Sequence, residues 1–83
     1  MNSSGTQEET ELRGRLAQLH RQLQECETNI IWTETRRSEI EHLNTFQRKF
    51  FFELNEAYQR EKRQLEAEIV AIEERLRRRE NIS

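Results

Sequence analysis

The feature that most constrains this chain is a repeat of apolar residues at alternating spacings of four and three. Near the start of the chain the repeat runs over six residues: Leu12, Leu16, Leu19, Leu23, Cys26 and Ile30. A second repeat of the same kind follows later: Leu65, Ile69, Ile72 and Leu76. Because an α-helix turns once in about 3.6 residues, this spacing forms one apolar stripe on each helix. The two stripes, here called the first seam and the second seam, predict an all-α coiled coil.

The composition agrees with a long helix that buries only one stripe. The 83 residues contain no proline, and 36% are charged whereas 33% are hydrophobic. The hydrophobic fraction lies well below the ~45–50% of an average globular domain. A chain this short and this polar buries little surface, which argues against a self-contained enzyme with a deep pocket.

Local signals predict where the helix starts and ends. Thr6 and Glu9 have the spacing of a capping box, in which each side chain accepts a hydrogen bond from the other residue's backbone amide, so the helix is expected to begin near residue 7. Arginines before Glu80 suit the negative end of a helix dipole. The predicted organisation is therefore a disordered tail over 1–6, a coiled-coil helix over 7–80 and a frayed end over 81–83.

A break in the middle of the chain is the main open question. Residues 28–38 are rich in Thr, Asn and Ser, which favour helices weakly, so a two-helix hairpin with a break near 33–38 is one alternative. It would bring Trp32 close to Phe50, Phe51 and Phe52. Because residues 28–45 contain no Gly, Pro or Asn-Gly, we expect an unbroken helix, a rod of about 105–110 Å. The two seams are out of phase along such a rod, which predicts a stutter between them.

Aromatic side chains gather in the middle of the chain. Successive residues on a helix point about 100° apart, so Phe50, Phe51 and Phe52 cannot all enter one two-stranded seam. Either a wider helical core or docking of another protein would cover them, and both are protein–protein contacts. The residues predicted to dock a partner are Trp32, Phe46, Phe50, Phe51, Phe52, Leu54 and Tyr58.

Residues suited to metal binding or catalysis are sparse. The soft metal-ligand candidates are His20, Cys26 and His42, and none lies three or four residues from another. Neither a glycine-rich phosphate loop nor a nucleophile elbow is present in the sequence. We therefore expect a non-enzymatic protein without a metal or a cofactor. A single cysteine cannot form an internal disulfide, which favours a reducing compartment.

Charge and hydropathy bear on where the protein works. The net charge is −2, so no overall field draws the chain to nucleic acid or to an anionic membrane. The first residues lack the basic and apolar parts of a signal peptide, and no window is apolar enough to span a membrane. The expected location is intracellular, either cytoplasmic or nuclear.

The run from Arg75 to Arg79 raises a second functional hypothesis, a basic helix that binds nucleic acid. Glu73 and Glu74 precede it at spacings that favour ion pairs with Arg77 and Arg78, and no aromatic residue interrupts it to stack on bases. A solvated, salt-bridged helix end is therefore the preferred interpretation. Elsewhere, glutamates flanking the second seam would face each other in a parallel homodimer, which favours a heteromeric or antiparallel bundle.

Taken together, the patterns predict a structural or adaptor subunit. In general type it resembles the short coiled-coil subunits that act as spacers, adaptors or lattice elements in larger assemblies, a likeness that rests on the heptads alone. Its seams would oligomerise it and its aromatic centre would dock a protein partner. The alternatives are the nucleic-acid-binding helix and a self-assembling helical lattice or bundle.

Overall fold

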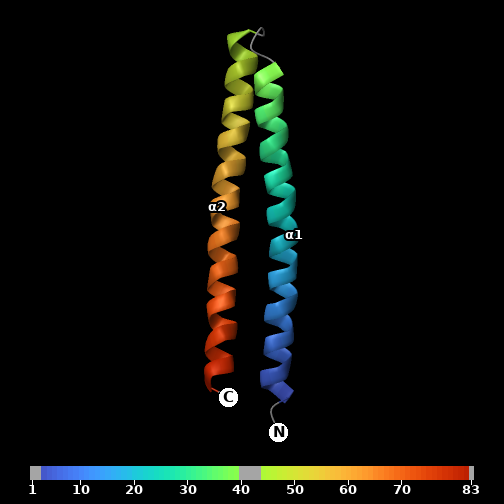
Figure 1. The fold of residues 1–83 in the computed structure, drawn as a ribbon, viewed down its shortest axis with the longest axis vertical. Coiled ribbons are helices and arrows are strands. Elements are labelled where there is room, and N and C mark those ends of the chain that lie inside the picture. Colours follow the sequence, from blue (N-terminus) through green and yellow to red (C-terminus); the bar gives the residue numbers. More distant parts are fainter. Residues whose placement is uncertain (1–2, 40–43, 83) are drawn as a thin grey trace.

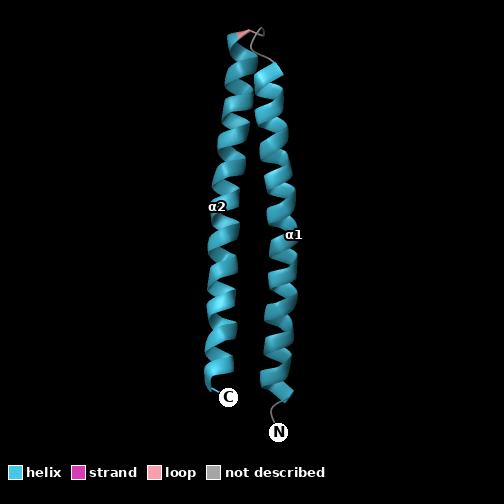
Figure 2. Cartoon of the chain, viewed as in Figure 1, coloured by secondary structure: helices cyan, strands magenta, loops and turns pink. Residues whose placement is uncertain are grey.

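The computed structural model describes residues 3–39 and 44–82, and these form two long helices that pack side by side. Helix α1 is Ser3–Glu39 and helix α2 is Thr45–Ile82. They run antiparallel, so the two chain ends lie together at one end of the molecule and the connection lies at the other (Figure 1). Helix accounts for nearly all of the described chain (Figure 2). The prediction of an all-α fold is confirmed.

The expectation of one unbroken helix over 7–80 is wrong, and the hairpin alternative is the observed arrangement. The molecule measures 65 × 15 × 14 Å, far shorter than a rod of the whole chain. Folding back lets each apolar seam bury itself against the other, whereas a lone rod would leave both seams in water.

The break also lies later than residues 33–38, because α1 continues to Glu39. Asn44 caps the start of α2: its Oδ1 accepts a hydrogen bond from the Gln47 amide at 2.9 Å, and its carbonyl accepts one from the Arg48 amide at 3.2 Å. A single Asn can begin a helix in this way without a nearby Gly or Pro. Ser38 lies inside α1 and does not start a new helix.

The two seams face each other and form the core. Five side chains make up its buried cluster: Leu19, Cys26, Ile30, Leu65 and Ile69. Leu16, Leu23 and Ile72 pack against that cluster and are partly buried, Leu76 is buried, and Leu12 is half-buried. We expected neighbouring chains to cover these seams, but here each helix covers the seam of the other. Because the seams lie on separate helices, their difference in phase needs no stutter.

The helix ends differ from the predicted limits by a few residues. Helix α1 begins at Ser3, so the predicted tail over 1–6 is partly helical and Thr6 lies within the helix instead of starting it. Helix α2 continues to Ile82, into the segment expected to fray. The remainder of both predicted ends lies outside the described residues.

Candidate protein-interaction site

The hairpin brings aromatic residues from both helices together near the connection. The ring centroids of Trp32 on α1 and Phe51 on α2 lie 5.9 Å apart with the rings tilted by 55°. Phe50 meets Phe51 edge to face, at 5.4 Å between centroids and 84° between planes. Along an unbroken helix Trp32 and Phe51 would lie about 30 Å apart. The proximity expected for the hairpin alternative is therefore observed.

Most of these rings stay accessible to solvent. Phe46 is 78% exposed, Phe50 53%, Phe52 48% and Trp32 47%. Phe51 is half-buried between its neighbours. These five residues are called the aromatic end below. Folding leaves a cluster of large apolar rings partly in water here, which is typical of a surface that binds another protein.

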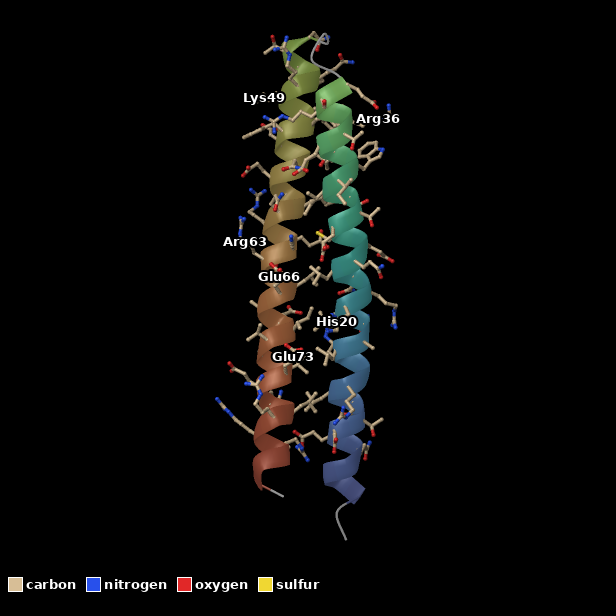
Figure 3. All side chains as sticks on the ribbon, in the orientation of Figure 1. His20, Arg36, Lys49, Arg63, Glu66 and Glu73 are labelled. Atoms are coloured by element: carbon tan, nitrogen blue, oxygen red, sulfur yellow. The ribbon has the colours of Figure 1, made fainter. Side chains whose placement is uncertain are left out.

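Two arginines of α1 form cation–π contacts with rings of the aromatic end. The Arg36 guanidinium lies 5.8 Å from the centroid of the Trp32 ring, and that of Arg37 lies 5.3 Å from the Phe52 ring. Arg36 also forms an ion pair with Glu39 at 3.5 Å (Figure 3). Stacking of a guanidinium on a ring is favourable by about 0.5–1 kcal/mol at exposed sites. Both rings remain about half exposed despite these contacts.

Two residues predicted to dock a partner lie outside the aromatic end, and one of them, Tyr58, belongs to the core. Tyr58 packs against the buried cluster, and its carbonyl accepts a hydrogen bond from the Cys26 thiol at 3.1 Å. Leu54 is half-buried. Tyr58 lies in the core because it continues the second seam. Counted back from Leu65 at the same spacing, that seam passes through Tyr58 and Phe51. The remaining docking candidates form the aromatic end.

A buried polar pair, which the apolar pattern did not predict, lies next to the aromatic end. Asn55 Nδ2 donates a hydrogen bond to Thr33 Oγ1 at 2.8 Å, and the Thr33 hydroxyl donates to the Ile30 carbonyl at 2.8 Å. Thr33 is fully buried and Asn55 is 8% exposed. Both positions follow from the spacing, since Thr33 extends the first seam and Asn55 the second. A pair that bonds only in this register also fixes how the two helices align.

No protein-family model, curated protein or solved structure matches this chain. None of the helices in the described part carries an apolar stretch long enough to cross a lipid bilayer. Within residues 3–39 and 44–82, no three His, Cys, Asp or Glu side chains are placed to hold a metal ion. His42, one of the candidate ligands, lies outside the described residues.

Cys26 has the environment of a core residue and not of a nucleophile. Burial raises the pKa of the Cys26 thiol, and the nearby charge of Glu61 raises it further. Reactive cysteines need a lowered pKa, because the thiolate is the attacking form. The thiol therefore serves as a small apolar group that bonds the Tyr58 carbonyl across the helices.

Two of the arginines near the end of α2, Arg75 and Arg79, form ion pairs with α1. Glu8 on α1 forms ion pairs with Arg75 at 3.4 Å and with Arg79 at 2.9 Å. Arg15 pairs with Glu68 at 3.2 Å in the same half of the molecule. The ion pairs observed at this end therefore cross between the helices. Among the described residues, the pairs of Glu73 and Glu74 with Arg77 and Arg78 that the spacing suggested do not form. Such pairs reduce the positive charge left for nucleic acid.

Proposed function

We propose that this protein is a non-enzymatic adaptor whose aromatic end docks a partner protein. The observation that carries the proposal is the uneven distribution of exposed apolar side chains over a hairpin whose seams already cover each other. In the described part of the chain, large exposed apolar side chains lie near the connection, with Val70 as the exception. A folded chain gains nothing by leaving these rings in water unless another surface covers them.

The construction of the aromatic end suits tight docking. Trp and Phe each bury about 150–250 Å² when covered, and aromatic residues often dominate the energy of protein interfaces. Here they are carried by two packed helices and oriented by Arg36 and Arg37. Rings held in place lose little conformational freedom when a partner binds, so more of the burial energy remains for affinity.

The seams are not part of this proposal. Their side chains pack against each other within one chain, so covering them requires no second copy. Oligomerisation stays a prediction of the heptad pattern. The nucleic-acid hypothesis has no support from the end of α2, where Arg75 and Arg79 are paired with Glu8.

Site-specific photo-crosslinking tests the proposal. A photoreactive phenylalanine analogue would replace Phe50, and in a matched control it would replace Val70. The two positions lie on the same helix and are 53% and 52% exposed, so they differ mainly in surroundings. In extracts of cells that produce the protein, we expect one discrete heteromeric adduct from position 50 and none from position 70.

A second variant asks whether the aromatic end carries the affinity. Phe46→Ser, placed in the position-50 crosslinking protein, should reduce the adduct about tenfold or more, since an interface hot spot contributes about 2 kcal/mol or more. Phe46 is 78% exposed, so the fold should be unaffected, which circular dichroism would check. Equal adducts from positions 50 and 70, no adduct, or an adduct with the mass of two copies would contradict the proposal.

A further inference from the structure

A groove lies beside the aromatic end, between the last turns of α1 and the first turns of α2. It has a volume of about 870 Å³ and is open to solvent. Most of its lining is basic, hydroxylic or aromatic: Arg37, Ser38, Thr45, Arg48, Lys49 and Phe52. Phe52 also belongs to the aromatic end, so the groove and the rings form one continuous surface. We call it the basic groove.

The charge of the groove is local. Among the described residues that line it, three are basic and one, Glu34, is acidic, whereas the whole chain has a net charge of −2. Arg37 is held over the Phe52 ring at 5.3 Å, so its guanidinium is positioned before any ligand arrives. Concave sites lined by one sign of charge concentrate the field and attract ligands of the opposite sign.

We propose that the basic groove binds an acidic segment of the protein that docks on the aromatic end. The inference rests on the proposed function and adds the chemistry of the partner. Arg37 offers a planar fork of donors that matches a carboxylate, and Lys49 offers a compact positive charge. The hydroxyls of Ser38 and Thr45 can donate to further carboxylates or to the backbone carbonyls of an extended peptide.

The same features favour a peptide over a nucleic acid. Tight binding to a phosphate backbone usually uses about six to ten phosphate contacts spread over a long surface. The described lining of the groove contains three basic side chains. Glu34, which also lines it, would repel a continuous run of phosphates. An acidic peptide can place its carboxylates on Arg37 and Lys49 and an uncharged residue beside Glu34. The neighbouring rings would then cover apolar residues of the same partner.

Fluorescence anisotropy with defined probes tests the inference on the full chain. The probe is a short labelled peptide of glutamates around one leucine, and its matched control has glutamine in place of each glutamate. A single-stranded oligouridylate of similar length is the third probe. We expect the glutamate peptide to bind, the glutamine peptide to bind at least about tenfold more weakly, and the affinity to fall as salt is added.

Variants assign the binding to the groove. The double variant Arg37→Gln, Lys49→Gln should weaken binding of the glutamate peptide about tenfold or more. Arg63→Gln removes one positive charge from an exposed position on α2 outside the groove and should leave binding unchanged (Figure 3). The single variant Lys49→Gln keeps the contact between Arg37 and the Phe52 ring. A loss of peptide affinity in this variant therefore cannot result from a change at Phe52.

Several results would overturn the inference. One is an equal loss of glutamate-peptide affinity in Arg63→Gln and Lys49→Gln. Another is no binding of the glutamate peptide at all. A third is that the oligouridylate binds more tightly than the glutamate peptide and through the same residues. The outcomes also separate the two proposals. An adduct from position 50 without peptide binding would remove only the groove inference, whereas peptide binding without an adduct would remove the docking proposal.

Discussion

In the half of the hairpin that holds the chain ends, aliphatic side chains fill the space between the helices, whereas the half next to the connection combines a polar pair with exposed rings. The first half contains Leu19 and Ile69, and ion pairs at its surface, such as Arg15–Glu68, connect the two helices. The second half contains Thr33 and Asn55 below the aromatic end. The difference indicates that one half holds the helices together, while the other half fixes their alignment and leaves aromatic rings exposed.

The largest expected effect lies in the aliphatic half. Leu19 is 0% exposed, so Leu19→Ala should lower the free energy of unfolding by about 2–5 kcal/mol through lost burial and the cavity left behind. Urea denaturation followed by circular dichroism measures this loss. The control is Val70→Ala, which should change stability by less than about 0.5 kcal/mol because Val70 is exposed. Equal losses in both variants would show that the seams do not form the core.

Disrupting the buried polar pair should have the second largest effect on the free energy of unfolding. Thr33→Val leaves the buried Asn55 amide without its acceptor, which should cost about 1–3 kcal/mol. The double variant Thr33→Val, Asn55→Leu removes both polar groups and should recover most of that stability. Because the pair specifies one register, sedimentation of the double variant should reveal additional oligomeric species. A double variant as unstable as the single one would contradict this account.

A stabilising change is expected in the aliphatic half. A Cβ atom at Gly14 would meet no heavy atom within 4 Å, apart from its chain neighbours and the backbone of its own helix. Gly14→Ala should therefore raise the free energy of unfolding by about 0.5–1 kcal/mol, because alanine restricts the unfolded chain and favours helix. Binding at the aromatic end should not change. A loss of stability in urea denaturation would contradict the placement of Gly14.

The smallest effect is a dependence on alkaline pH at Cys26. Because burial raises the pKa of this thiol in the folded chain, the folded state favours the protonated form. That contribution is complete below the ordinary thiol pKa of about 8.5 and is lost as the pH rises through the folded value. As the pH rises above the ordinary thiol pKa of about 8.5, the free energy of unfolding should fall more steeply in the wild type than in Cys26→Ala. Identical slopes would place Cys26 outside the core.

Much of the fold could be read from spacing alone. Leu19, Ile30 and Leu65 lie in the core because a repeat of four and three marks a single helix face wherever that helix packs. The connection could not be located in this way. Helix α2 begins after Asn44, a cap that carries none of the glycine or proline signals by which turns are usually identified.

The candidate site was predicted in part. Trp32 and Phe50 stood out because rings on successive helical positions cannot all face one seam. Tyr58 is predicted to dock a partner, whereas in the structure it packs against the core. Thr33 and Asn55 are polar, so the apolar pattern does not mark them. Their burial depends on a partner across the helices, which spacing within one helix does not reveal.

The sequence by itself determined that this protein is helical, which faces of its helices are apolar and which rings cannot enter a seam, since these follow from the local geometry of an α-helix. Only the tertiary structure decided that the two seams cover each other within one chain, that Trp32 lies on Phe51 and that a basic groove forms beside them. The physical reason is that folding back joins residues far apart in the chain. Their contact energy depends on the pairing of the helices and not on either helix alone.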